Sequence, residues 1–252
     1  MVHFIGAGPG GADLITVRGA RLLGEADVII YAGSLVNPAL LDYKKEGCQV
    51  YDSASMTLEQ VIEVMKAAEE RGGVTVRLHT GDPSLYGAIR EQMDELDKLG
   101  LPYDDTPGVS SFCGAAAALN AEYTLPGVSQ SVIITRLAGR TPVPERENLA
   151  ALAAHGATMV LFLSAALLDS VQTELLRGAY TAATPAAIVY KATWPEEKII
   201  HCTVGTLASS GPEAGVRSTA LVLVGDFLRP NYQRSKLYDP SFTTGYRRGD
   251  AT

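Results

Sequence analysis

The sequence of 252 residues is poor in the residues that build disulfide frameworks and metal centres. Its three cysteines, Cys48, Cys113 and Cys202, are too far apart for a Cys-x-x-Cys site, and its four histidines show no ligand spacing. We therefore expect neither a disulfide framework nor a metal site. A reducing, cytoplasmic location is the simplest expectation.

Long apolar runs and an excess of positive charge are also missing. The longest apolar stretch, about 157–168, is too short to cross a bilayer, and Met1–Ile5 carry no basic leader of a signal peptide. Acidic residues number 28 and basic residues 21, a net charge of −7 that argues against non-specific nucleic-acid binding. An anionic small molecule is not excluded, because a basic cleft can lie on an acidic protein.

Short apolar runs alternate with stretches of helical periodicity along the whole chain. Strands are predicted at 2–6, 27–31, 48–51, 74–78, 132–136, 158–163, 186–191, 198–204 and 219–224, and helices at 14–23, 58–68, 84–99, 110–121, 145–154 and 167–177. This order predicts two α/β domains, the first with a mainly parallel sheet and the second with a mixed sheet. We place them at 1–121 and 122–230, followed by a polar tail at 231–252.

The first strand ends in a glycine loop that could form a ligand site. Gly6, Gly8 and Gly11 fit the Gly-x-Gly-x-x-Gly spacing of dinucleotide sites. Pro9, however, has no N–H to donate to phosphate, and the second strand ends at Tyr31–Ser34 without an acid for a ribose. A nucleotide-phosphate site, a plain turn, and a loop shaped around another ligand all remain open.

A second candidate site follows the strand at 74–78, in the segment His79–Gly87. In open α/β sheets, ligands bind beyond the carboxyl ends of the strands. Gly81 allows a ligand to approach the backbone, and Asp82 could accept hydrogen bonds from a hydroxyl or an amine. Equally, Asp82 or Ser84 could cap the next helix.

Two further segments lie at strand ends. In Thr106–Ser111, Ser110 is best interpreted as a helix cap. The segment Val189–Glu197 holds Trp194, the only tryptophan, and reads as a hairpin turn with this ring packed at its rim.

Together these segments resemble the signatures of the tetrapyrrole methylases, which methylate uroporphyrinogen and precorrins with S-adenosylmethionine. Gly6–Gly10 followed by Leu14–Gly19 resembles the N-terminal signature, and Thr80–Pro83 followed by Thr106–Gly108 resembles the second one. Four segments at 31–36, 135–144, 161–164 and 189–198 are most like those of precorrin enzymes. The resemblance covers about residues 1–230.

The resemblance implies two α/β domains with S-adenosylmethionine bound between them. The implied cofactor contacts are Pro9, Thr80, Gly81, Asp82, Leu85, Ser110, Ser111, Leu163, Ala192, Thr219 and Ala220. The glycine loop would then face the tetrapyrrole. The expected substrate contacts are Gly6, Gly8 and Gly10, with Arg136, Arg140 and Lys191 for the substrate carboxylates.

The resemblance leaves the proton acceptor open. Family members that act on uroporphyrinogen carry an aspartate directly after the tyrosine of the second strand, and this chain has Ala32 there. The difference favours a precorrin enzyme, with Tyr31 and Ser34 as weak candidates for a base.

We therefore expect an S-adenosylmethionine-dependent C-methyltransferase of cobalamin synthesis. A homodimer is expected because the family is dimeric and the second half offers apolar strands such as 220–224. The alternatives are a dinucleotide-binding oxidoreductase and a non-enzymatic module that binds a tetrapyrrole or a nucleoside.

Overall fold

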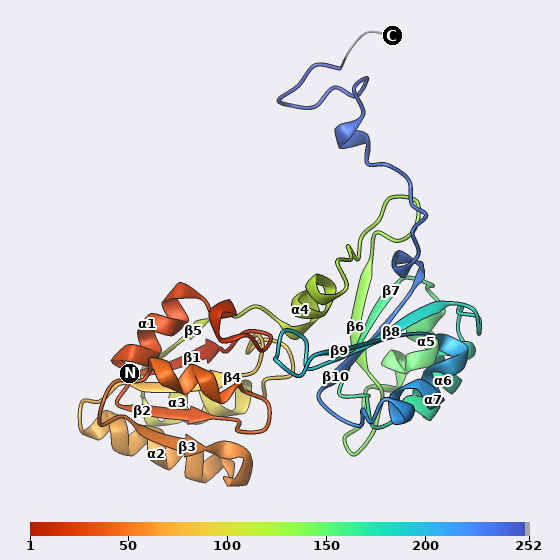
Figure 1. Cartoon of the computed structure of the whole chain (residues 1–252). Coiled ribbons are helices and arrows are strands. Elements are labelled where there is room, and N and C mark those ends of the chain that lie inside the picture. The colour runs from red at the N-terminus through yellow and green to blue at the C-terminus, as the bar shows by residue number, and fades with distance from the viewer. Residues whose placement is uncertain (250–252) are drawn as a thin grey trace. The chain divides into compact units, whose positions relative to one another are not determined.

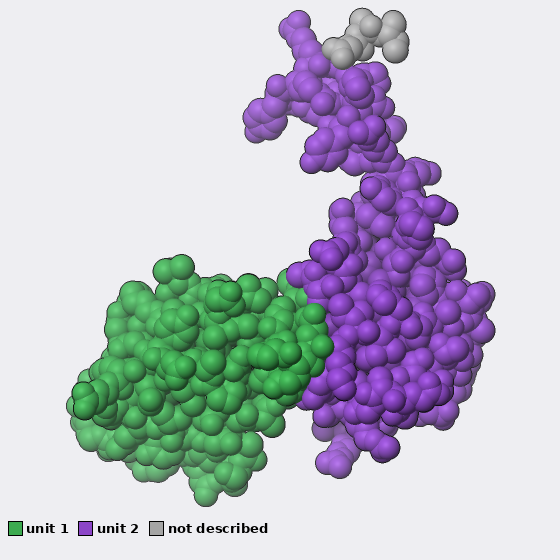
Figure 2. Space-filling model, in the orientation of Figure 1, with its two compact units in different colours: residues 1–115, 191–197 green, residues 116–190, 198–252 purple. Residues whose placement is uncertain are grey.

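The computed structural model describes residues 1–249, and the last three residues of the expected polar tail lie outside this range. The chain forms two compact units, coloured separately in Figure 2. The first comprises Met1–Ala115 and the short segment Lys191–Glu197, and the second comprises Ala116–Tyr190 and the chain from Lys198 onward. Each unit is an α/β structure, as the sequence predicted, and each contains a five-stranded sheet (Figure 1).

The sheet of the first unit is parallel throughout and has the order β3-β2-β4-β1-β5. Its strands are β1 (Val2–Gly6), β2 (Val28–Tyr31), β3 (Gln49–Asp52), β4 (Thr75–His79) and β5 (Tyr103–Thr106). The helices are α1 (Val17–Glu25), α2 (Leu58–Glu70) and α3 (Arg90–Leu99), and α4 (Ser111–Ala118) continues from this unit into the second. The carboxyl ends of all five strands therefore lie along one edge of the sheet.

Alternating side chains divide the strands between two apolar layers. Ile5 packs with Leu22 and Leu23 of α1, whereas Phe4 packs with Met65 of α2 and Leu96 of α3. Figure 1 shows these helices on the two faces of the sheet. Burial on both faces explains why the central strand β2 is an almost continuous apolar run.

The sheet of the second unit is mixed, with the order β6-β7-β10-β8-β9. The strands are β6 (Val132–Arg136), β7 (Thr158–Phe162), β8 (Pro185–Tyr190), β9 (Lys198–Thr203) and β10 (Ala220–Val224), and the helices are α5 (Leu149–Ala153), α6 (Leu168–Leu176) and α7 (Leu207–Glu213). β6 and β7 are parallel, and β10 runs antiparallel to both β7 and β8. The carboxyl ends of β6, β7 and β8 and the amino end of β10 thus share one edge.

Three elements differ from the sequence prediction. α3 begins at Arg90 rather than 84, because Tyr86 and Ala88 have left-handed backbone that no helix tolerates. The prediction missed β5, an edge strand whose central residues are the exposed Asp104 and Asp105. It also missed α7, a short helix with a proline inside.

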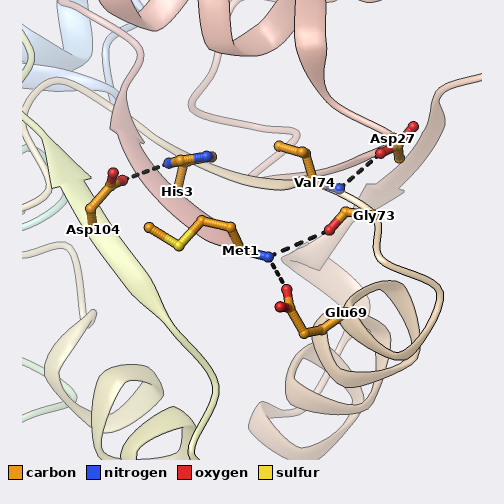
Figure 3. A network of polar contacts seen from close by, with 7 residues as sticks. All are labelled: Met1, His3, Asp27, Glu69, Gly73, Val74 and Asp104. Carbon is orange, nitrogen blue, oxygen red and sulfur yellow. Dashed lines mark hydrogen bonds and ion pairs between the residues drawn. The ribbon is translucent and has the colours of Figure 1, made fainter.

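Polar contacts join several segments of the first unit near the chain's amino terminus (Figure 3). The Met1 amine contacts the Glu69 carboxylate, and the Val74 N–H donates to Asp27 at 2.8 Å. His3 of β1 contacts Asp104 of β5 at 2.6 Å. Two of these contacts tie the start of the chain and β1 to α2 and β5, and the third joins the residues that precede β2 and β4.

Candidate functional site

Three glycines meet where β1, β4 and β5 end. A Cβ atom on Gly6 would lie 2.4 Å from the Gly108 Cα and 2.5 Å from the Gly81 carbonyl oxygen, and one on Gly108 would lie 2.1 Å from the same oxygen. No side chain fits at Gly6 or Gly108. The two signatures noted in the sequence are therefore packed against each other, backbone to backbone, at one place.

The glycine loop after β1 has little left to offer a phosphate. The Ala7 N–H donates to the His79 carbonyl oxygen at 2.7 Å, and Gly8 and Gly81 exchange hydrogen bonds of 3.2 and 2.9 Å. The Gly11 N–H donates to the Thr193 hydroxyl at 2.9 Å. Because these three donors are bonded within the protein and Pro9 has no N–H, few N–H groups of the loop remain for a pyrophosphate.

Asp82 ties two loops of this edge together. One of its oxygens accepts the Ser84 N–H at 2.9 Å and the Ser84 hydroxyl, and the other accepts the Gly108 N–H at 2.9 Å. Burial by itself would raise the pKa of Asp82, but the hydrogen bonds from Ser84 and Gly108 lower it below its usual value. Asp82 therefore remains an ionised acceptor that joins the loops after β4 and β5.

The other expected cofactor residues of this unit lie around Asp82. The Thr80 hydroxyl donates to the Leu35 carbonyl oxygen at 3.1 Å, and the Leu85 N–H donates to the Asp82 carbonyl oxygen. The buried Ser110 immediately precedes α4, of which Ser111 is the first residue. The ring of Pro9 packs against Gly114 in the same helix.

A carboxylate at the end of β3, which sequence reasoning overlooked, holds the loop after β2. Tyr31 ends β2, Ser34 is exposed in the next turn, and Asp52 is the register partner of Tyr31 on β3. The Asp52 carboxylate accepts the Gly33 N–H and the Ala54 N–H, each at 2.9 Å. The N–H groups of Ala54 and Gly33 lower the pKa of Asp52, so this carboxylate is ionised. An acid ending the strand next to Tyr31 was a usable signal in the sequence.

Ala192 lies in the segment Lys191–Glu197, which connects β8 to β9 and belongs to the first unit. We call this segment the hairpin tip. Ala192 is buried, and its neighbours Lys191 and Thr193 have left-handed backbone with φ of 47° and 67°. Trp194 of the tip lies against Gly10 of the glycine loop.

The second unit brings its own expected cofactor residues to one sheet edge. Leu163 follows β7, Thr219 precedes β10, and Ala220 is the first residue of β10, which pairs with β7 in antiparallel register. Leu163 has a φ of 52° and is 66% exposed, and Thr219 has a φ of 53°. An exposed leucine in left-handed backbone is strained and has no packing to explain it, as is common where a ligand binds.

The basic residues expected to bind substrate have different surroundings. The Arg136 guanidinium donates to the carbonyl oxygens of Thr141 at 3.1 Å and Pro142 at 2.6 Å, so it holds the loop that carries the exposed Arg140. Lys191 lies 3.6 Å from Glu196 and 4.8 Å from the centre of the Trp194 ring.

Two basic side chains of β4, Arg77 and His79, are buried below the edge where β1, β4 and β5 end. Arg77 donates to Gln92 at 3.0 Å and to the Ile30 carbonyl oxygen at 3.2 Å, and burial lowers its pKa to about 10. Burial and the charge of Arg77 lower the pKa of His79 to about 3. The His79 Nε2 atom is buried without a hydrogen-bond partner in the part of the chain that the structure describes.

The electrostatics of this edge suit a cationic ligand better than a phosphate. Asp82 and Asp105 both approach it, and burial followed by the charges of Asp82 and Asp104 raises the pKa of Asp105. Carboxylates that repel one another are stabilised by a positive charge. The sulfonium and amino groups of S-adenosylmethionine are positive, so these residues fit that cofactor.

Comparison with known proteins identifies the family. The family model described as Tetrapyrrole (Corrin/Porphyrin) Methylases matches residues 1–208. This range holds the glycine loop, both loops joined by Asp82, the hairpin tip and Leu163. The chain belongs to the tetrapyrrole methylases.

Individual relatives show which members of the family this chain resembles. The chain is 52% identical over 248 residues to the cobalt-precorrin-4 C(11)-methyltransferase of Methanocaldococcus jannaschii, covering 98% of this chain and 96% of the relative. A solved structure of cobalt precorrin-4 methyltransferase, a cobalamin biosynthetic enzyme, matches with a TM-score of 0.89 at 47% identity, over 91% of this chain and 96% of that one. The uroporphyrin-III C-methyl transferase from Thermus thermophilus complexed with S-adenyl homocysteine matches with a TM-score of 0.76 at 26% identity, over 90% and 98%.

Within residues 1–249, no helix is both long and apolar enough to cross a membrane.

Proposed function

We propose that this protein is an S-adenosylmethionine-dependent methyltransferase that methylates C-11 of precorrin-4, with or without cobalt in the ring, in cobalamin biosynthesis. The observation that carries the proposal is the 52% identity to a cobalt-precorrin-4 C(11)-methyltransferase over nearly the whole of both chains. Methylation of the same class of substrate at C-17 or C-20 is the alternative within the family.

The cofactor residues form two groups, one on each sheet edge. In the first unit they are Pro9, Thr80, Gly81, Asp82, Leu85, Ser110, Ser111 and Ala192, and in the second they are Leu163, Thr219 and Ala220. The solved relative with S-adenyl homocysteine supports this choice of cofactor. S-adenosylmethionine supplies a methyl group that its sulfonium has already activated.

The residues of this chain then have two tasks, which are to orient the cofactor and the substrate and to exclude water. Asp82 fixes the loops after β4 and β5, so the cofactor meets a preformed surface. Holding two reactants in contact geometry can lower a barrier by roughly 7–11 kcal/mol. The ionised Asp52, beside Tyr31 and Ser34, supplies the carboxylate that position 32 lacks and is our candidate for the proton acceptor.

Arginine and lysine side chains bind the substrate carboxylates. Arg140 is exposed on the loop that Arg136 holds, so its guanidinium can pair with a substrate carboxylate, and Lys191 can exchange Glu196 for the substrate. Gly6, Gly8 and Gly10, in contrast, face other protein atoms through their Cα atoms. They support the site and need not touch the substrate.

A homodimer remains part of the proposal on the family resemblance alone. The apolar strand 220–224 no longer argues for it, because β10 lies between β7 and β8 and its side chains fill the core. Sedimentation at micromolar concentration tests this point, and a 26.6 kDa species would count against it.

The decisive experiment is incubation with isotopically labelled S-adenosylmethionine and either precorrin-4 or cobalt-precorrin-4. Mass analysis and NMR of the product should find one labelled methyl group on C-11. A label on C-17 or C-20 would support the alternative. Thermal stabilisation by NAD and not by S-adenosylhomocysteine would reject a methyltransferase.

A further inference from the structure

The hairpin tip Lys191–Glu197 packs against the glycine loop. A Cβ atom on Gly10 would lie 2.0 Å from Cδ1 and 2.3 Å from Nε1 of the Trp194 ring, and 2.8 Å from the Ala192 carbonyl oxygen. The space that a side chain would need at Gly10 is therefore filled by the indole. The absence of a side chain at Gly10 is explained by Trp194, a residue far away in the sequence.

A hydrogen bond fixes the tip to the next residue of the loop. The Gly11 N–H donates to the Thr193 hydroxyl at 2.9 Å. The Thr193 methyl group also lies near Gly114 of α4, since a Cβ atom there would be 3.4 Å from it. Thr193 thus contacts both the glycine loop and the helix that follows Ser110.

The tip is braced internally in a strained conformation. The Thr193 N–H donates to the Glu197 carboxylate at 2.6 Å, and the Trp194 N–H donates to the Lys191 carbonyl oxygen at 3.0 Å. Thr193 has a φ of 67°, which is a genuine outlier for a β-branched residue. Such backbone persists only where its surroundings enforce it, and it is common at ligand sites.

We propose that the hairpin tip is a positioning element for the cofactor and that Gly10 and Gly11 are its seat. Seated in this way, Thr193 and Trp194 hold the backbone of Ala192 in place for S-adenosylmethionine. The inference rests on the proposed function, because that function makes Ala192 a cofactor contact. Thr193, Trp194 and Gly10 act through Ala192 and are positioning residues.

The proposal predicts weaker binding of the cofactor when the tip loses its hydrogen bond to the loop. Thr193→Val removes the hydroxyl and keeps the shape, so S-adenosylhomocysteine should bind about three- to tenfold more weakly, the loss expected for one neutral hydrogen bond. Thr193→Ser keeps the hydroxyl and should bind within about twofold of wild type. The KM for S-adenosylmethionine should rise in Thr193→Val, with kcat at saturating cofactor unchanged.

The fluorescence of Trp194, the sole tryptophan, reports without any ligand on how firmly the tip is held against Gly10 and Gly11. In Thr193→Val, acrylamide should quench Trp194 fluorescence more strongly than in wild type, because the tip is less firmly held. Gly10→Ala, which forces the indole out, should show a larger increase and weaker cofactor binding than Thr193→Val. The matched control is Thr173→Val, which removes the hydroxyl of an exposed threonine on α6, bonded to the Asp169 carbonyl oxygen, and should change neither readout.

The outcomes separate this inference from the proposed function. If wild type does not bind S-adenosylhomocysteine, the proposed function fails, whereas the quenching experiment still tests the seat. If wild type binds it and the Thr193→Val affinity equals the wild-type affinity, the inference is overturned and the function stands. Equal weakening in Thr193→Ser and Thr193→Val would also overturn it, because the hydroxyl would then not matter.

Discussion

His79 should make the first unit lose stability as the pH falls from 7 to 5. The imidazole is buried between the sheet and its α2–α3 layer, stacked on Phe4 with 6.1 Å between ring centres and close to the charge of Arg77. Burial, followed by that charge, lowers its pKa from 6.5 to about 3. The folded protein therefore keeps His79 neutral at pH values where the unfolded chain protonates it.

The size of the effect follows from the difference in proton binding. Because the folded pKa of His79 is lowered, its full contribution to stability is present above pH 6.5 and is lost as the pH falls toward 3. Each pH unit within this window costs 1.36 kcal/mol of differential protonation, so lowering the pH to about 5 should cost about 2 kcal/mol. That is a large part of the stability of a typical domain.

Urea denaturation followed by the fluorescence of Trp194 measures this loss, since the only tryptophan belongs to the same unit as His79. Wild type should lose about 2 kcal/mol more between pH 7 and 5 than His79→Gln, which cannot titrate. His201→Gln removes an exposed histidine on β9 and should behave like wild type. An equal pH dependence in wild type and His79→Gln would refute the reasoning.

Three further substitutions test the site. Asp82→Ala should weaken S-adenosylhomocysteine binding at least about tenfold, because it frees the Gly108 and Ser84 N–H groups, and an unchanged calorimetric affinity in a folded variant would reject this role. Gly108→Ala should lower the free energy of unfolding by about 1–3 kcal/mol in urea titrations, because its Cβ would collide with the Gly81 carbonyl oxygen, and wild-type stability would show that the loops have room to move. Asp52→Asn should lower kcat and leave S-adenosylhomocysteine affinity unchanged, and a wild-type kcat would remove Asp52 as proton acceptor.

Apolar periodicity was sufficient to predict every strand except β5. The central strands β2, β7 and β10 are nearly continuous apolar runs, and their burial in the middle of each sheet is the physical reason that they stand out. Turn-only connection also indicated the antiparallel pair β8–β9. The α/β class, the parallel first sheet and the mixed second sheet are therefore confirmed.

Edges and loops escaped the prediction because their signals depend on tertiary partners. β5 is held by pairing with β1 while Asp104 and Asp105 face solvent, so its sequence looks like a loop. Asp52 gains its place beside Tyr31 from the pairing of β2 with β3. Gly10 looked like a loop glycine for a ligand, and only the packing of Trp194 reveals why it lacks a side chain.

Non-glycine residues with left-handed backbone occur close to the expected cofactor residues, and no local sequence pattern predicts this conformation. Of the seven described non-glycine residues with left-handed backbone, five coincide with or adjoin an expected cofactor residue: Tyr86, Leu163, Lys191, Thr193 and Thr219. Each such residue costs about 1–3 kcal/mol, which packing must offset elsewhere. None of these five residues is an asparagine or an aspartate, the residues for which this conformation is easiest. A fold that needed only tight turns would place glycine at these positions, as it does at Gly100 after α3. Side chains at these five positions therefore indicate contacts that glycine could not make, as the Thr193 hydroxyl does with the Gly11 N–H.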